Sequence, residues 1–81
     1  MKLLDSARKL RLKLERDYAK LGIDFYEVNQ FQHWFADLKW AVEKNDEVAS
    51  WKRRFKTFAD VRVAKGGKLA ELYREFLAEL D

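Results

Sequence analysis

The side chains in this sequence that could do chemistry are few and far apart. Histidine occurs once, at position 33, and Asp37 follows it by one helical turn. A His–carboxylate pair can share a proton or supply two metal ligands, but a zinc site needs at least a third protein ligand. The chain has no cysteine and no second histidine. We therefore expect a solvated pair here, with no metal site and no cofactor.

The other catalytic patterns are equally incomplete. Glu71, Glu75 and Glu79 form a stripe at four-residue spacing, which could hold a cation only opposite acidic or His residues turned into a bundle core. The serines stand near expected helix starts, where serine commonly caps, and neither is close in sequence to His33. The segment Gly66-Gly67-Lys68 is too short for a phosphate-binding loop and follows no strand. We predict neither an enzyme nor a small-molecule substrate.

Helices must position these residues, because apolar side chains recur at three- and four-residue intervals along most of the chain. The spacing predicts an all-α bundle of four helices, at about residues 5–21, 24–44, 46–65 and 68–80, in a single domain spanning residues 1–81. Residues 60–64 alternate as a strand would, but a lone short strand has no partner. We expect a frayed or kinked helical end there. Within the second of these helices, apolar residues keep an unbroken 3-4-3-4 spacing at Val28, Phe31, Phe35, Leu38 and Val42.

The sharpest boundary signal surrounds Asp24. The carboxylate of Asp24 is expected to accept the Glu27 backbone N–H, while the Glu27 side chain reaches back to the N–H of Asp24. Ile23 and Val28 could then close over the turn, and Gly22 suits a left-handed residue that ends the preceding helix. Two further N-caps are expected, at Asp5 for the first helix and at Asn45-Asp46 for the third.

Composition limits the class of protein. Of 81 residues 48% are hydrophobic and 15% aromatic, enough large side chains to build a core without disulfides. Charged residues within Met1–Asp5 argue against a signal peptide, and no apolar run approaches the length that spans a bilayer. We expect a cytoplasmic protein that does not enter a membrane. Net charge alternates from one predicted helix to the next, positive, negative, positive and negative, which favours an up-down bundle.

One group of polar and aromatic residues lies opposite the apolar stripe of the 24–44 helix. At 100° per residue, several of its side chains project to that side, including Trp40. Exposed Trp and Tyr tend to mark protein contacts; the alternative is that the last helix or the N-terminus covers them. We predict a non-enzymatic macromolecular binding module (a small regulator, adaptor, inhibitor or assembly subunit) that contacts a protein partner or a second copy. The contact residues are Tyr26, Asn29, His33, Asp37 and Trp40.

The basic third helix supports an alternative function. Clustered cations with interleaved aromatics can neutralise phosphates and stack on bases. The aromatics Trp51, Phe55 and Phe58 also fall at core spacing, and cations are favoured near a helix C-terminus, so a structural interpretation competes. A net charge of +3 is modest for a nucleic-acid-binding protein. The alternative nucleic-acid-binding residues are Arg53, Arg54, Lys56, Arg62, Lys65 and Lys68.

Overall fold

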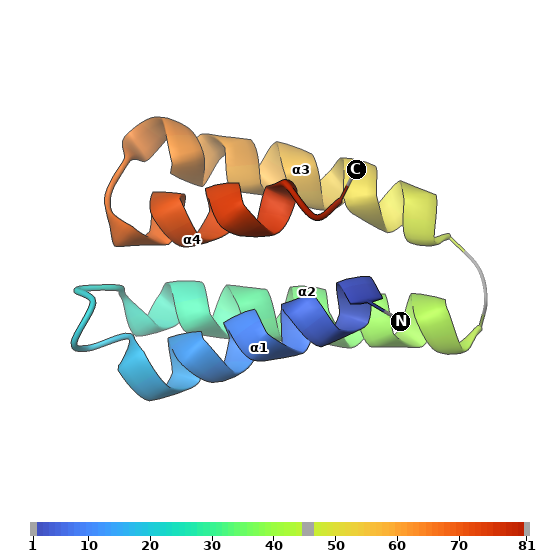
Figure 1. Cartoon of the computed structure of the whole chain (residues 1–81), viewed down its shortest axis with the longest axis horizontal. Coiled ribbons are helices and arrows are strands. Elements are labelled where there is room, and N and C mark those ends of the chain that lie inside the picture. The colour runs from blue at the N-terminus through green and yellow to red at the C-terminus, as the bar shows by residue number, and fades with distance from the viewer. Residues whose placement is uncertain (1, 45–46, 81) are drawn as a thin grey trace.

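The computed structural model describes residues 2–44 and 47–80, and these residues form helices joined by short turns (Figure 1). The all-α prediction is confirmed for this part of the chain, and residues 60–65 are helical. The helices are α1 (Lys2–Asp17), α2 (Phe25–Glu43), α3 (Val48–Lys65) and α4 (Lys68–Leu77).

Successive helices run in opposite directions, so α1 and α2 form one hairpin and α3 and α4 a second one facing it (Figure 1). Their backbones meet in the cyclic order α1, α2, α3, α4 and back to α1. In the described residues, neither diagonal pair brings Cα atoms within 8 Å. This is an up-down-up-down bundle, in which the basic helices α1 and α3 are diagonal to each other. Of the two helices between them, α2 carries a net negative charge, while α4 has equal numbers of basic and acidic residues.

The first corner has the geometry that Gly22 predicts. Gly22 has a φ of 72°, in the left-handed region where glycine pays no steric penalty. The N–H of Gly22 donates to the carbonyl of Ala19 at 3.2 Å, and the N–H of Ile23 donates to the carbonyl of Tyr18 at 2.8 Å. These two bonds form a Schellman motif. It closes the turn that carries the chain from Asp17 into α2.

Asp24 caps α2, but the predicted reciprocal hydrogen bonds between Asp24 and Glu27 side chains and backbone do not form. The Asp24 carboxylate accepts the N–H of Tyr26 at 3.0 Å, and the N–H of Glu27 donates to the backbone carbonyl of Asp24 at 2.9 Å. The Glu27 carboxylate points to Arg62 on α3 instead. A guanidinium offers two charge-assisted hydrogen bonds, which outweigh the single backbone N–H available at the cap.

The first helix starts before its predicted cap. α1 is already helical at Lys2, so Asp5 lies in the first turn, where its carboxylate pairs with Arg8 at 3.2 Å. Leu3 is buried in the core, and this burial extends the helix towards the N-terminus. The regular part of α1 ends at Asp17, and turn residues carry the chain on to Gly22.

The residues that directly precede the two later helices, Glu47 and Gly67, make no side-chain capping bond. The predicted cap at Asn45-Asp46 lies outside the described residues, and Glu47, which directly precedes α3, has a φ of 57° and makes no side-chain capping bond. Between α3 and α4, Gly66 and Gly67 have φ angles of 76° and 91°. These conformations strain other residues, which explains why glycine occupies both positions.

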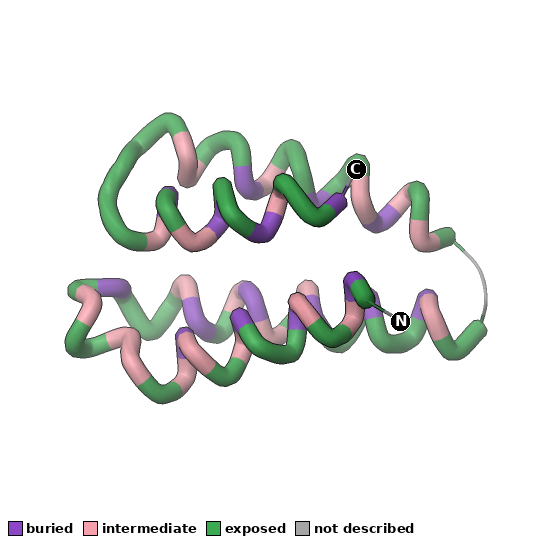
Figure 2. The backbone as a smooth tube through the Cα atoms, in the orientation of Figure 1, coloured by how far each residue is buried: buried purple, intermediate pink, exposed green. Residues whose placement is uncertain are grey.

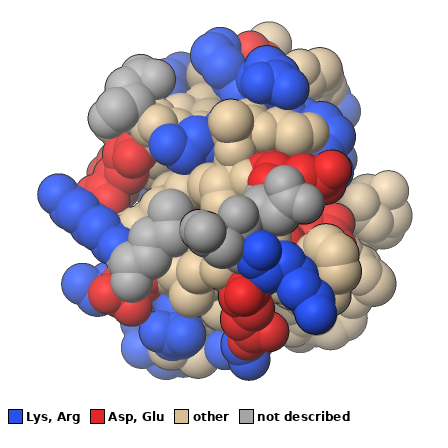
Figure 3. Space-filling model, turned by 90° about the vertical axis from the view of Figure 1, so that its right-hand side faces the viewer, with Lys and Arg blue, Asp and Glu red and all other residues tan. Residues whose placement is uncertain are grey.

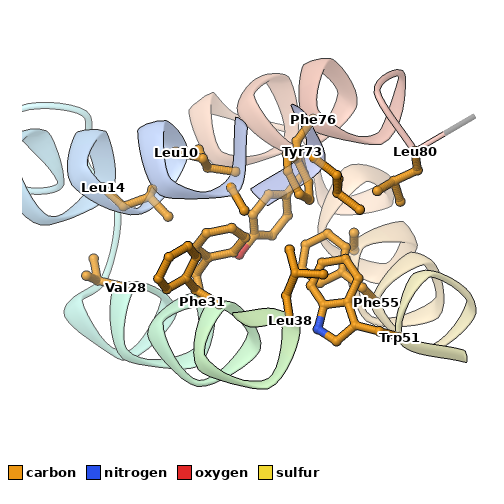
Figure 4. Close-up of a cluster of buried hydrophobic side chains, with 14 of the residues drawn as sticks. Leu10, Leu14, Val28, Phe31, Leu38, Trp51, Phe55, Tyr73, Phe76 and Leu80 are labelled. Atoms are coloured by element: carbon orange, nitrogen blue, oxygen red, sulfur yellow. The ribbon is translucent and has the colours of Figure 1, made fainter. Parts of the chain in front are cut away.

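The core is aromatic and is shared by all four helices. Buried residues line the inward sides of the bundle (Figure 2). The rings of Trp51 and Phe55 on α3 stack in parallel at 5.0 Å between centroids, and Phe55 also meets Phe31 of α2 at 5.8 Å and Phe76 of α4 at 5.4 Å (Figure 4). Leu10 and Leu14 bring α1 onto the same cluster. The three residues Phe31, Phe55 and Phe76 thus join helices that are diagonal as well as adjacent.

Candidate functional site

The second helix has two unlike faces. Its inward face places Val28, Phe31 and Leu38 in the core with no exposed surface. Its outward face carries five exposed residues, which we call the outer stripe. The core contacts hold α2 in place, so the outer stripe is presented on a fixed helix. The outer stripe consists of Tyr26, Asn29, His33, Asp37 and Trp40.

The two aromatic residues of the outer stripe are the most exposed large hydrophobic side chains in the described part of the chain. Tyr26 exposes 59% of its surface and Trp40 exposes 58%. Lys44, one turn beyond, places its ammonium 5.9 Å from the centre of the Trp40 ring. The alternative that α4 or the N-terminus folds over this side is therefore excluded for the residues that the structure describes. The outer stripe is free surface at both ends of α2.

The N-terminal end of the outer stripe continues into a further exposed aromatic ring. Phe25, the first residue of α2, exposes 54% of its surface. Its ring meets that of Tyr18 edge-to-face at 5.3 Å, which fixes its orientation on the α1 side. Sequence reasoning did not assign Phe25 to the contact face, because it lies off the line of the outer stripe.

The middle of the outer stripe is polar and not linked internally. His33 and Asp37 are both exposed, and the structure gives no hydrogen bond or ion pair between them. The described residues contain no group of three or more His, Asp or Glu side chains that could hold a metal ion. Of the glutamate stripe, Glu71 pairs with Lys68 at 3.5 Å and Glu79 accepts a hydrogen bond from Ser6. These polar groups can therefore serve recognition by hydrogen bonding.

The six residues predicted to bind nucleic acid lie on α3 and at the start of α4, and several of them contact other side chains of the protein. Lys56 pairs with Asp60 at 2.9 Å, and Lys68 pairs with Glu71. Arg54 places its guanidinium 5.8 Å from the ring centre of Trp34. Arg53 and Lys65 are exposed. The six cations therefore lie in unlike surroundings, five on α3 and Lys68 on α4.

The aromatic residues interleaved with these cations are not available for stacking on bases. Trp51 and Phe55 are fully buried. Phe58 is half-buried, and the Arg62 guanidinium lies 3.7 Å from the centre of its ring. The basic residues of α1 lie on the helix diagonal to α3, so the two do not form one continuous face. Nucleic-acid binding through α3 stays a prediction that rests on charge alone.

Sequence reasoning missed an ion pair between α2 and α3. Arg62 donates from Nε to one oxygen of Glu27 at 2.8 Å and from a terminal nitrogen to the other at 3.1 Å. The two side chains are only 19% and 18% exposed, and the pair raises the pKa of Arg62. A signal existed: Trp51, Phe55, Phe58 and Arg62 continue one 4-3-4 spacing, which places Arg62 on the core side of α3.

A buried hydroxyl was also missed. Tyr73 on α4 is fully buried and its hydroxyl oxygen has no hydrogen-bond partner. Burial raises the pKa of this phenol strongly, and the nearby carboxylate of Glu27 raises it further. The ring itself packs on Phe31 and Phe55, with centroids 6.0 Å and 5.6 Å away. Tyr73 thus serves the core as an aromatic ring, with a hydroxyl that is not paired.

A cleft of about 250 Å³ lies between α1 and α4. Apolar side chains of Leu10, Leu72 and Phe76 line it together with Lys and Glu residues. The Ser6 hydroxyl at this cleft donates to Glu79 and not to a histidine, because His33 lies on the outward side of α2. Ser6 and His33 are therefore not paired.

The charges at the end of the bundle that carries both termini are mixed. Basic and acidic side chains alternate over this end without forming a single-sign surface (Figure 3).

None of the helices in the described part of the chain is both long and apolar enough to cross a membrane. Comparison with protein-family models, with curated proteins and with solved structures finds no match to this chain.

Proposed function

We propose that this chain is a macromolecular binding module that captures a protein partner through the outer stripe of α2. The observation that carries the proposal is the exposure of Tyr26 and Trp40 on a helix whose opposite face is fixed in the core. Trp and Tyr are enriched among the few interface residues that dominate binding energy. A fixed helix also loses little conformational entropy when it binds.

The polar residues of the outer stripe suit the periphery of such a contact. Asn29 and His33 can donate and accept hydrogen bonds, and Asp37 can accept them. Protein interfaces typically surround aromatic anchors with polar groups of this kind. The module would act by occupying or bridging surfaces, as a small regulator, adaptor, inhibitor or assembly subunit does.

Site-specific photo-crosslinking tests this proposal in the cells that produce the protein. A photoreactive residue replaces Ala36, which is exposed on α2 beside the outer stripe. We expect a covalent adduct that disappears when Trp40→Glu is added. The matched control is Leu12→Glu, because Leu12 is a comparably exposed apolar residue on α1. This second variant should leave the adduct unchanged.

The free energy of unfolding must be measured beside the adduct. Because Trp40 is exposed, Trp40→Glu should change that free energy by only about 0.5 kcal/mol. The proposal is wrong if no adduct forms, if Trp40→Glu leaves the adduct intact, or if Leu12→Glu removes it equally well.

A further inference from the structure

The spacing of the outer stripe is the same read forwards and backwards. From Tyr26 to Trp40 the intervals are three, four, four and three residues, with His33 at the centre. The chemistry is ordered in the same way: an aromatic residue, a polar residue, the histidine, a polar residue and an aromatic residue. A helix rises 1.5 Å per residue, so the outer stripe extends over about 21 Å.

From this symmetry we infer that the partner is a second copy of the chain, bound antiparallel through α2 about a two-fold axis at His33. This inference rests on the proposed function and names its partner. A two-fold interface uses the same patch on both subunits, so each contact occurs twice. Antiparallel pairing about His33 sets Tyr26 opposite Trp40 of the second copy, and Asn29 opposite its Asp37.

The opposed residues are complementary. Each aromatic ring meets an aromatic ring, an arrangement that favours edge-to-face or offset packing. The side-chain amide of Asn29 can donate to the Asp37 carboxylate of the second copy, because an ionised carboxylate only accepts hydrogen bonds. No two like formal charges oppose each other along the outer stripe at neutral pH.

The ends of α2 favour the same direction of pairing. Antiparallel alignment brings the positive N-terminal end of each helix dipole beside the negative C-terminal end of the other. Lys44 follows the last residue of α2, and Asp24 precedes the first. In the antiparallel register Lys44 and Glu43 of one copy both lie within two residues of Asp24 of the other, so the attraction and the repulsion at these ends offset each other and the helix dipoles set the preference.

Another exposed apolar residue of the bundle shows why this face is preferred to its neighbours. Leu12 on α1 is 48% exposed, but Arg8, Lys9 and Arg16 on the same helix are also exposed. Placing this surface against itself would oppose cations in a shared, partly desolvated interface, which is unfavourable. The outer stripe has one carboxylate and one imidazole and avoids that cost.

Cysteine crosslinking reads out the register directly, because the natural chain has no cysteine. A disulfide needs Cα atoms within about 7 Å, so it reports which positions face each other. Under mild oxidation, His33→Cys should crosslink to itself. Asn29→Cys and Asp37→Cys should each crosslink poorly alone and efficiently when mixed. The control is Ala64→Cys, at an exposed position on α3.

We expect the facing positions to crosslink about tenfold faster than the control, since dimerisation raises their effective concentration. Self-crosslinking of Asn29→Cys and of Asp37→Cys, without crosslinking of the mixture, would show parallel pairing and overturn the antiparallel register. Crosslinking of His33→Cys no faster than Ala64→Cys would overturn the self-contact altogether.

Light scattering on the unmodified chain separates this inference from the proposed function. We expect the wild-type mass to rise to twice 9.7 kDa with concentration, and Trp40→Glu to remain monomeric. A wild-type chain that stays monomeric, with photo-adducts to a different protein, would refute the dimer and leave the proposed function standing. If photo-crosslinking gives no adduct with a second copy and none with a different protein, both the dimer and the proposed function are refuted.

Discussion

The α2–α3 interface and the α1–α4 interface differ in the side chains that form them. Between α2 and α3, the ring of Trp34 meets those of Trp51, Phe55 and Phe58 at centroid distances of 5.2 to 6.0 Å. The indole N–H of Trp51 also donates to the Trp34 carbonyl at 3.0 Å. Between α1 and α4 a cleft remains, and Ser6 on α1 donates a hydrogen bond to Glu79, which follows α4.

Opposite charge does not close the α1–α4 interface. Lys9 and Lys13 line the cleft with Glu75 and Glu79, yet within residues 2–44 and 47–80 no ion pair joins α1 to α4. Exposed ion pairs contribute only about 0–1 kcal/mol each, so solvation competes with them. The comparison teaches that packed rings join α2 to α3, whereas the opposite charges that line the cleft between α1 and α4 form no ion pair within the described residues.

Truncating a ring should expose the largest difference between the two interfaces. Trp51→Ala removes a fully buried indole and should lower the free energy of unfolding by about 3–5 kcal/mol. Ser6→Ala, the control in the α1–α4 interface, should cost no more than about 1 kcal/mol. Urea unfolding measures both variants. Equal losses would contradict the contrast between the interfaces, and Trp51→Phe serves if the alanine variant does not fold.

Breaking the ion pair of the α2–α3 interface should have an intermediate effect. Glu27→Gln keeps the shape of the side chain but leaves the half-buried Arg62 guanidinium without its carboxylate, which should cost about 2 kcal/mol. Glu71→Gln breaks the exposed pair with Lys68 and should cost less than about 0.5 kcal/mol. Chemical denaturation of both variants at one ionic strength makes the comparison. A loss at Glu27 no greater than that at Glu71 would show that burial adds nothing to the pair.

The smallest effect at neutral pH is expected at Tyr73. Because its hydroxyl is buried without a partner, Tyr73→Phe should leave the free energy of unfolding unchanged or raise it by about 1 kcal/mol. Burial raises the pKa of Tyr73, so above the ordinary tyrosine pKa of about 10 the unfolded chain ionises this phenol and the folded chain does not. The free energy of unfolding of the wild-type chain therefore falls as pH rises beyond that value.

Denaturant unfolding of wild type and Tyr73→Phe from neutral to alkaline pH checks this expectation. The stability advantage of the phenylalanine variant should widen above about pH 10 and stay constant below it. A constant difference across the alkaline range would show that the Tyr73 hydroxyl is accessible to water. Phenolate absorbance gives an independent reading, because burial raises the pKa of Tyr73 above that of an ordinary tyrosine.

The sequence predicts the helices well because core spacing and turn chemistry are local signals. The run from Val28 to Leu38 faces inward as expected, and Gly22 adopts its predicted left-handed conformation. The outward position of Trp40 also follows from 100° per residue, and the structure confirms its exposure. These features need no knowledge of which helices are neighbours.

Contacts between helices were harder to foresee. Glu27 satisfies the spacing of a capping box, and Arg62 satisfies that of a basic cluster, so each had a local explanation that concealed their pairing. The early start of α1 likewise depends on the burial of Leu3, a tertiary effect.

Because the three tryptophans are buried to different degrees, their fluorescence reports on the state of the protein. Trp51 is enclosed, Trp34 is half-buried and Trp40 is open to water. Indole emission shifts to shorter wavelength when water is removed from around the ring. The emission of Trp51 should therefore shift to longer wavelength only when the bundle unfolds. The emission of Trp40 should shift to shorter wavelength only when a partner covers the outer stripe of α2. The direction of the emission shift therefore distinguishes unfolding from binding.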